Sequence, residues 1–334
     1  MALRQEIIED SYPEGHALPG EHALCQRFNV SRATLRLALS ELEKDGYIKR
    51  QPGNGTFANP SRMVMPRALG LLLLEPHKAG TVGMSAMIHG ANAYLDSLGS
   101  QLTIINRPPQ QWNIPLIRSL AGVLVVPTTI TPAHLKSIDD LSLPRIGVTD
   151  NDLPGASVRF DVKSAAKTLT DHLLSLGHRR FALISGHDVH SDYLRKLGIA
   201  EALTQAGIDF ATVPDYRTNY DTEIAWEAVR RLFKTTPHPT AIIAFDDSLA
   251  LQVIRAAQDA GLNVPRDVSV TGFNDSPHAA LVNPSISTVR IPFIEAGRKA
   301  AEALCQNYLR HIPVEDIPLK TEWIPRESTG PAQS

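Results

Sequence analysis

Two groups of residues in this sequence have types and spacings suited to chemistry, and the first group is basic. Arg32 and Arg36 are four residues apart in a segment with helical periodicity, so they share one face of a predicted helix. Thr34 lies near the exposed N-terminal turn of the same helix. Cations at the start of a helix oppose its macrodipole, and this arrangement makes sense where phosphates or guanine edges face it. The segment is therefore predicted to bind nucleic acid.

The second group is polar and follows the predicted strands directly. In an open α/β sheet, ligands bind outside the carboxyl ends of the strands, so side chains at these positions are candidates for binding. Their hydroxyl, amide and carboxylate groups suit a neutral sugar or polyol, whose hydroxyls need both donors and acceptors. For Asp246 and Asn274 a turn or capping role stays open, and for the others simple solvation of a loop stays open. The candidates are Glu75, His77, Thr128, Asp150, Asp246 and Asn274.

The elements that position the basic group are a helix-turn-helix and a hairpin. A short amphipathic segment ends at a turn at Asn29-Val30, Ser31 is a favourable N-cap for the next helix, and Gly46 ends that helix. Two β-prone runs then flank a glycine-rich turn at residues 52–55, which predicts a wing. A small helical subdomain with surface arginines is the alternative. The predicted DNA contacts are Ser31, Arg32, Thr34, Arg36, Lys49, Arg50, Gly53, Asn54 and Gly55.

The elements that position the polar group are alternating strands and helices, which indicate parallel sheets with right-handed crossovers. Two successive series of them suggest two similar doubly wound lobes. The segments at 287–291, 292–308 and 319–324 can join either lobe, so the chain is expected to cross between the lobes more than once. Strands are expected at residues 68–74, 102–105, 123–126, 145–148, 181–184, 210–213, 241–244 and 268–271.

These patterns divide the chain into three parts, in an α/β protein with a winged helix-turn-helix at its start. Residues 1–58 form the DNA-binding domain, and residues 59–66, where periodicity stops and prolines appear, form a linker. Residues 67–330 form the effector-binding domain. Of the possible placements of the later segments, we expect a first lobe of about 67–157 and 290–317 and a second lobe of about 158–289 and 318–330.

Composition sets limits on the class of protein. The chain has 334 residues, 43% hydrophobic content and a formal net charge of −2, so basic residues must act locally rather than through overall charge. Cys25 and Cys305 lie in apolar helical contexts and are expected to be packing residues. No charged start is followed by an apolar run, and the run at 69–74 is too short to span a bilayer. A cytoplasmic protein without a membrane segment is expected.

Residues 18–58 closely resemble the winged-helix domain of the GntR family of bacterial repressors. The family often has Ser-Glu-Arg after Leu-Pro, where this chain has Gly20-Glu21-His22. The resemblance implies binding to double-stranded operator DNA. It is carried by Leu18-Pro19, Glu21, Leu24, Phe28, Val30-Ser31-Arg32, Thr34, Arg36, Ala38, Leu42, Gly46 and the wing residues Gly53, Gly55, Thr56 and Phe57.

Residues 67–330 resemble the effector domain of the LacI family, which is similar to periplasmic sugar-binding proteins. A winged head on such a body is also seen in arabinose-responsive repressors, which the whole chain resembles. The resemblance is stronger in the second half of this region. It is carried by the segments Leu176-Gly177-His178-Arg179-Arg180, Leu194-Arg195-Lys196-Leu197-Gly198, Phe245-Asp246-Asp247-Ser248, Val264-Pro265-Arg266-Asp267-Val268, Thr271-Gly272-Phe273-Asn274-Asp275 and Pro325-Arg326-Glu327-Ser328-Thr329.

The resemblance implies particular roles for single residues. Arg195 matches the family's ligand-contacting arginine, Asp246 and Asn274 match positions that hold sugar hydroxyls, and Tyr220 falls near an aromatic stacking position. Asn274 stands where the family more often has Asp. The implied protein is a homodimeric repressor of a carbohydrate-utilisation operon, with a sugar or related polar molecule as its effector. A ligand-binding protein whose winged segment contacts other proteins is the alternative.

An enzyme is not expected from the motifs in this sequence. There is no Gly-x-Ser-x-Gly, His-Glu-x-x-His or phosphate-binding glycine loop. His187-x-x-His190 has metal-ligand spacing but lacks further ligands, so a solvated loop is favoured over a metal site. No metal and no cofactor are therefore predicted.

Overall fold

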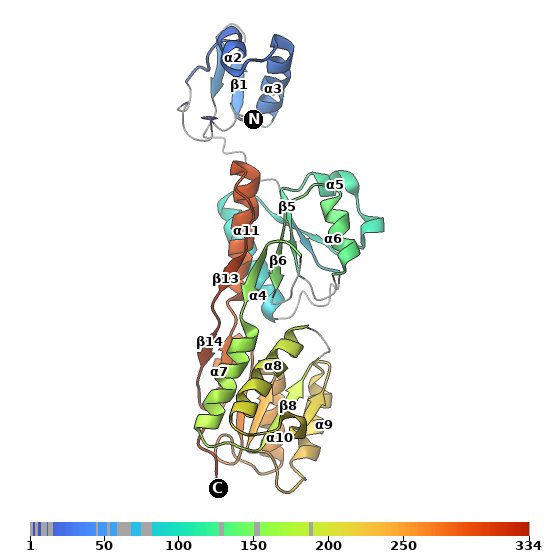
Figure 1. Ribbon diagram of the computed structural model, residues 1–334, viewed down its shortest axis with the longest axis vertical. Coiled ribbons are helices and arrows are strands. Elements are labelled where there is room, and N and C mark those ends of the chain that lie inside the picture. The colour runs from blue at the N-terminus through green and yellow to red at the C-terminus, as the bar shows by residue number, and fades with distance from the viewer. Residues whose placement is uncertain are drawn as a thin grey trace.

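A computed structural model describes residues 3, 6–7, 12, 16–44, 46–51, 54–58, 68–74, 82–126, 130–149, 154–186 and 190–333. Figure 1 shows a small N-terminal head followed by two α/β lobes along the long axis of the molecule. The long helix α11 lies in the lobe next to the head, and the C-terminus lies at the far end of the second lobe. Among the described residues, no helix is long and apolar enough to cross a membrane.

The head is a helix-turn-helix with a two-stranded wing. It consists of α2 (Glu21–Phe28), α3 (Arg32–Lys44), β1 (Ile48–Gln51) and β2 (Gly55–Ala58). The turn between the helices places Asn29 at φ 50°, a left-handed conformation that Asn tolerates well. The strands pair antiparallel from Ile48–Ala58 to Gln51–Gly55, which confirms the predicted hairpin. A small core holds the unit together, with Leu24, Leu35, Leu39 and Leu42 buried in it.

The first lobe is a six-stranded parallel sheet in the order β13-β7-β6-β5-β3-β4. Apolar clusters form on both of its faces, which is why its strands read as continuous hydrophobic runs. Its elements are β3 (Leu69–Leu72), α4 (Val82–Ser97), β4 (Leu102–Ile105), η2 (Pro109–Gln111), α5 (Ile114–Arg118), β5 (Gly122–Val125), α6 (Pro132–Asp139), β6 (Arg145–Thr149), β7 (Ser157–Phe160), α11 (Phe293–Arg310) and β13 (Ile317–Leu319).

The second lobe is a four-stranded parallel sheet in the order β11-β10-β8-β9, again with an apolar cluster on each face. Helices α7 and α8 pack against each other, as do α9 and α10. Its elements are α7 (Val162–Ser175), β8 (Phe181–Ser185), α8 (His190–Gln205), η3 (Phe210–Thr212), β9 (Asp215–Arg217), α9 (Thr222–Leu232), β10 (Ala241–Ala244), α10 (Asp247–Asp259), β11 (Ser269–Thr271) and η4 (Pro277–Ala280).

The chain crosses between the lobes where β7 leads into α7, where β12 (Thr288–Arg290) leads into α11, and where β13 leads into β14 (Glu322–Ile324). The strands β12 and β14 pair antiparallel beside the second lobe. These crossings lie within a few residues of the approximate lobe boundaries at 157, 290 and 317.

Two strand predictions were wrong. Phe210–Thr212 form the short helix η3 because Asp209 accepts a hydrogen bond from the backbone N–H of Ala211, and the strand begins later, at Asp215. The single strand expected near 319–324 is two strands, β13 and β14, which belong to different sheets. The first difference arises from a local hydrogen bond and the second from the crossing of the chain between the lobes. The hydrophobic pattern of the sequence indicates neither.

Helices α4 and α11 approach so closely that glycine is required at their contact. A Cβ on Gly90 would overlap the carbonyl oxygen of Ile294, and a Cβ on Gly297 would overlap that of Met87. The long C-terminal helix is thereby fixed to the first lobe, although the two helices are far apart in the sequence.

We expect Gly90→Ala to lower the free energy of unfolding by about 1–3 kcal/mol, because the backbones of two helices must separate. Alanine has the higher helix propensity, so a loss must come from this contact and not from the helix itself. Gly83→Ala in the same helix is the matched control: its Cβ would lie 2.9 Å from the ring of Phe293, a side chain that can move, so the loss should be smaller. Urea unfolding of the two variants measures the difference. Equal stability of Gly90→Ala and the wild type would contradict it.

Candidate functional site

The structure brings together the four predicted effector residues of the second lobe. Asp246 comes two residues after the end of β10, and Asn274 comes three residues after the end of β11, so both lie at the carboxyl edge of this sheet. Arg195 reaches the same edge from α8: its Nη1 donates a hydrogen bond to the carbonyl oxygen of Phe245, 2.5 Å away. Its guanidinium carbon lies 4.2 Å from the ring centre of Phe273. The arginine therefore contacts the residue that precedes Asp246 and the residue that precedes Asn274.

Arg195 is also part of a buried polar network with Tyr220 and Asp192. The Tyr220 hydroxyl donates to Asp192 Oδ1 over 2.6 Å, and Arg195 Nη1 lies 3.3 Å from that hydroxyl and 3.6 Å from the carboxylate. The other Asp192 oxygen accepts the backbone N–H of Gly186 at 3.0 Å. Only 8% of Arg195 and 1% of Asp192 are exposed. The arginine is thus a structural member of the lobe as well as a candidate ligand contact.

The electrostatics of this network keep Tyr220 neutral. Burial raises the pKa of Tyr220 above its usual range. Burial also raises the pKa of Asp192, while the positive charge of Arg195 and the hydrogen bond from Tyr220 act to lower it. A Cβ on Gly186 would overlap the Tyr220 ring, so glycine at that position is what allows the ring to pack there.

Asp246 performs the capping role that the sequence left open. Its Oδ1 accepts the backbone N–H of Leu249 at 2.8 Å at the start of α10. Burial raises the pKa of its carboxyl group, and the N–H groups of the helix start and the charge of Arg195 oppose that shift. A role as cap orients the carboxylate at the sheet edge and does not exclude a ligand.

Asn274 and Asp275 form a tight loop with positive φ angles, 97° and 53°. The Asn274 backbone N–H donates to the carbonyl oxygen of Val289 at 2.8 Å, which ties the loop to β12. Within the described part of the chain, the buried Asn274 Oδ1 has no hydrogen-bond partner. A buried amide oxygen left without a donor is costly, and a ligand hydroxyl would satisfy it.

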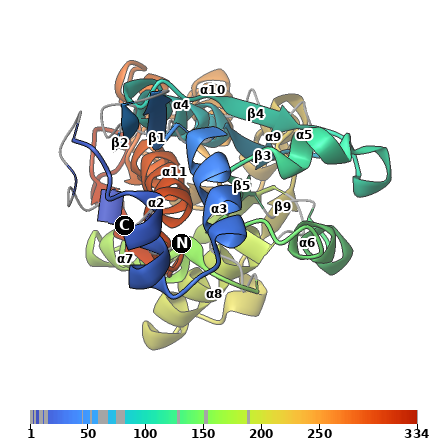
Figure 2. The same cartoon turned by 90° about the horizontal axis from the view of Figure 1, so that it is seen from above.

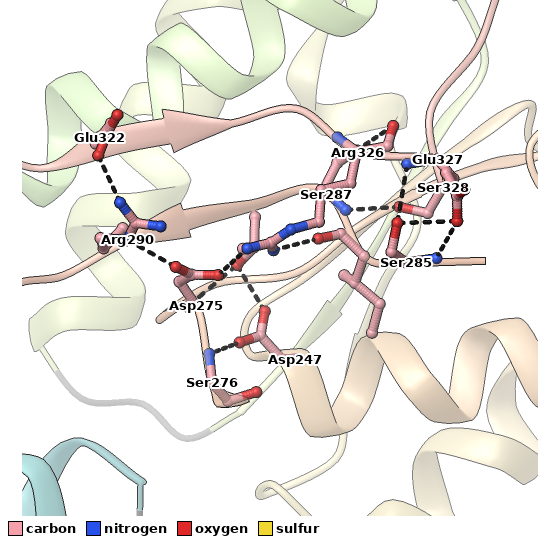
Figure 3. Close-up of polar contacts among 12 residues, drawn as sticks. Asp247, Asp275, Ser276, Ser285, Ser287, Arg290, Glu322, Arg326, Glu327 and Ser328 are labelled. Atoms are coloured by element: carbon pink, nitrogen blue, oxygen red, sulfur yellow. Dashed lines mark hydrogen bonds and ion pairs between the residues drawn. The ribbon is translucent and has the colours of Figure 1, made fainter. Parts of the chain in front are cut away.

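The loop is anchored to the crossing strands by the ion pairs shown in Figure 3. Asp275 accepts from Arg290 at 2.7 Å and from Arg326 at 2.6 Å, and Arg290 also pairs with Glu322 at 2.9 Å. Arg290 ends β12, while Arg326 follows β14. The candidate effector loop is therefore connected by charge to the strands that pass between the lobes.

Asp247 lies behind this loop and is 1% exposed. Its carboxylate accepts the Thr288 hydroxyl and the backbone N–H of Ser276, each at 2.6 Å (Figure 3). Burial raises the pKa of Asp247 to about 6, despite these two hydrogen bonds. A Cβ on Gly272 would overlap the carboxylate, so the sheet end and the helix start fit together closely here.

Sequence reasoning missed Asp192, although an acid three positions before Arg195 on the same helix is a sequence signal. Asp275 stands next to the candidate Asn274 after a predicted strand, but its ion-pair partners are found only in the folded chain. Phe160 and Phe293 were also missed; their rings meet edge to face at 5.7 Å where the chain crosses between the lobes.

The predicted first-lobe contacts Glu75, His77, Thr128 and Asp150 lie outside the described residues, as do Gly53 and His187. The side chain of His190 is likewise not described. The structure therefore places only the second-lobe half of the predicted effector site.

The candidate DNA surface is the N-terminal half of α3 with the wing. Ser31 caps the helix as predicted, since its Oγ accepts the Thr34 N–H at 3.1 Å. Arg36 pairs with Glu21 of α2 at 3.0 Å, and Arg50 pairs with Glu43 at 3.5 Å. Among the described residues none forms an ion pair with Arg32. The remaining described candidates, Lys49, Asn54 and Gly55, are exposed.

Fold and sites together define a class of protein: a winged helix-turn-helix head joined to a two-lobed, periplasmic-binding-protein-like body. The model of the bacterial regulatory proteins of the gntR family matches residues 1–58, and that of the periplasmic binding protein-like domain matches residues 170–329. The chain is 29% identical to the arabinose metabolism transcriptional repressor of Geobacillus stearothermophilus, over 98% of this chain and 97% of that protein.

Solved structures share the fold of the body. A LacI family regulator from Enterococcus faecium with bound ribose has a TM-score of 0.71 at 20% identity, over 80% of this chain and all of that one. The transcriptional regulator CelR in complex with cellobiose has a TM-score of 0.69 at 21% identity, over 93% of this chain and 100% of that chain.

Proposed function

We propose that this protein is a ligand-responsive, DNA-binding transcriptional regulator that represses a carbohydrate-utilisation operon and acts in the cytoplasm, where the DNA is. The proposal rests on the presence of two parts in one chain. One part is a winged head with an exposed Arg32, and the other is a sensor body whose polar groups lie together at one sheet edge. The similarity to an arabinose metabolism repressor along nearly the whole chain supports it.

The proposed effector is a sugar, bound between the lobes. Asn274 Oδ1 supplies an unsatisfied acceptor, while Asp246 and the Arg195–Tyr220 pair border the same edge. The ribose and cellobiose bound to two proteins of this fold support the ligand class. Glu75, His77, Thr128 and Asp150 of the first lobe are proposed to complete the shell when the lobes close on the ligand.

A single winged domain contacts little DNA, so we propose that the protein is a homodimer joined through the sensor body and binds a palindromic operator. The domain division follows: reader 1–58, linker 59–66 and sensor 67–330. Closure of the lobes on the effector would change the geometry of the dimer and move the two heads out of register with their half-sites.

A sugar screen combined with a gel shift tests the proposal. L-arabinose, D-ribose and cellobiose should be added to the purified protein, and a true effector should raise its melting temperature, with a shift that grows with the logarithm of sugar concentration above the Kd. The same sugar should release genomic fragments that the protein retards in a gel. A protein that retards no fragment, yet binds a sugar, would favour the alternative in which the winged segment contacts other proteins.

Arg32→Ala should weaken operator binding by about 1–3 kcal/mol if the guanidinium contacts a base edge. Arg36→Ala should weaken it less, because Arg36 already shares its charge with Glu21. Wild-type affinity should also fall steeply with salt. Titrations of operator DNA with the wild type and each variant, at two salt concentrations, measure the losses of affinity and the salt dependence. Arg231→Ala on the second lobe is the control. Wild-type affinity of Arg32→Ala would show that α3 is not the reading helix.

A further inference from the structure

Leu37 is the one large apolar side chain of α3 that points away from the core of the head. It is 68% exposed, whereas Leu35, Leu39 and Leu42 are between 2% and 8% exposed. At 3.6 residues per turn those three leucines form one stripe, and Leu37 falls on the opposite side of the helix. Leu37 is therefore not part of the core of the head and is free to contact another molecule.

The surroundings of Leu37 suit close approach to another molecule. Ala33 lies one turn earlier on the same outward line, and both Ala33 and Thr34 are exposed. The first turn of α3 has no acidic residue, and it begins with the exposed Arg32. Arg36 is turned sideways toward Glu21 of α2 and leaves the outward line clear. The first two turns of this line are therefore apolar and narrow, with a cation at the start, and the exposed Glu41 follows one turn after Leu37.

We propose that Leu37, with Ala33, reads the C5-methyl group of a thymine in the major groove; this rests on the proposed DNA-binding function. The major groove presents hydrogen-bonding edges and one apolar group, the thymine methyl, and apolar side chains are its partners. A second protein is a poorer occupant, because a stable protein interface buries about 800 Å² on each side and this apolar line is one leucine and one alanine.

The proposal assigns Leu37 specificity rather than general affinity. A cation that contacts phosphates, such as the exposed Lys49, attracts DNA of any sequence, whereas a methyl contact distinguishes thymine from cytosine and from uracil. Loss of one buried methyl contact corresponds to about three- to fivefold in affinity. An effect of this size is measurable by competition.

The experiment uses the full-length protein and the genomic fragment that it retains most tightly. The bound segment is synthesised with each thymine in turn replaced by uracil, which removes only the C5-methyl group. We expect uracil at one or two positions of each half-site to weaken wild-type binding about three- to fivefold. Leu37→Ala should weaken binding to the parent fragment by a similar factor and should no longer distinguish thymine from uracil at those positions.

Two further variants separate specificity from affinity. Lys49→Ala should weaken binding to every fragment by a similar factor and keep the thymine preference. Leu116→Ala, which removes a 47% exposed leucine on α5 of the first lobe, should behave as the wild type. Because Leu37 is exposed and alanine favours helices, Leu37→Ala should melt at the wild-type temperature.

The outcomes are distinguishable. If Leu37→Ala keeps the wild-type ratio between thymine and uracil at all positions, or if the wild type is insensitive to uracil throughout, the methyl contact is refuted while DNA binding stands. If the folded wild-type protein retains no fragment, the proposed function and the methyl contact both fail.

Discussion

Arg195→Ala is expected to lower the free energy of unfolding by about 3–5 kcal/mol at pH 7, because it leaves a buried carboxylate without its cation. Asp192 is 1% exposed, and the positive charge of Arg195 is the largest influence that opposes the rise of its pKa. The substitution also removes the hydrogen bond to the Phe245 carbonyl oxygen and the packing on the ring of Phe273. Each loss acts on the second lobe and not on the head.

Urea unfolding of a variant series measures this effect and isolates its cause. Arg195→Lys keeps the charge and should lose much less, while Arg231→Ala, which breaks an exposed pair with Glu227, should be close to neutral. If the unpaired carboxylate is the cause, Asp192→Asn should partly restore the stability of Arg195→Ala. An Arg195→Ala protein with the wild-type midpoint, or a double variant less stable than the single one, would contradict the argument.

A test of whether Arg195 contacts the effector therefore requires Arg195→Lys, because Arg195→Ala is expected to destabilise the second lobe. Resemblance alone assigns Arg195 a contact with ligand, and on that basis Arg195→Ala should fold and merely lose its response. The structure adds that the same guanidinium holds Asp192 and Tyr220 in place. Operator binding by Arg195→Lys, with and without the sugar identified by thermal shift, separates loss of response from loss of fold.

The fold was largely predictable because its signals are local. Continuous apolar runs marked strands buried on both faces, and the two series of strands and helices correspond to the two parallel sheets. The head was predictable for the same reason, since Ser31, the Asn29 turn and the hairpin each depend on near neighbours in sequence. The strands β13 and β14 are defined by pairing with distant strands, β7 and β12, in two different sheets. The hydrophobic pattern of the sequence therefore did not separate them.

The candidate site was predictable only as a set of positions. The rule that ligands bind at the carboxyl ends of strands selected Asp246 and Asn274, and the structure brings them to one edge with Arg195. The strand-end rule could not supply the interactions that hold this edge together. Asp275, next to Asn274, pairs with Arg290 and Arg326, which are 15 and 51 residues away in the sequence. Ion pairs of this kind depend on the crossing strands, and sequence spacing carries no record of them.

Asp247→Asn is expected to remove a pH dependence of stability that the wild type shows between pH 4 and pH 7. Burial raises the pKa of Asp247 from the ordinary value of 3.8 to about 6 in the folded protein. The folded state therefore holds this proton over a range where the unfolded state has released it. Stability falls as pH rises wherever the folded state binds more protons, so this group costs the wild type about 2 kcal/mol between pH 4 and pH 7.

Asparagine can replace this carboxyl group without losing its contacts. The amide oxygen can accept the Ser276 N–H, and the amide nitrogen can donate to the Thr288 hydroxyl, which then turns to accept. The stability of Asp247→Asn relative to the wild type should therefore improve by about 2 kcal/mol from pH 4 to pH 7. Asp267→Asn is the control: hydrogen bonds from Arg266 and Asn263 lower the pKa of that carboxyl, so its difference from the wild type should stay constant above pH 5. Urea unfolding midpoints of the wild type and both variants at pH 4, 5, 6 and 7 test this prediction. If the difference between Asp247→Asn and the wild type does not change with pH, the Asp247 carboxyl is already ionised in the folded protein at pH 4.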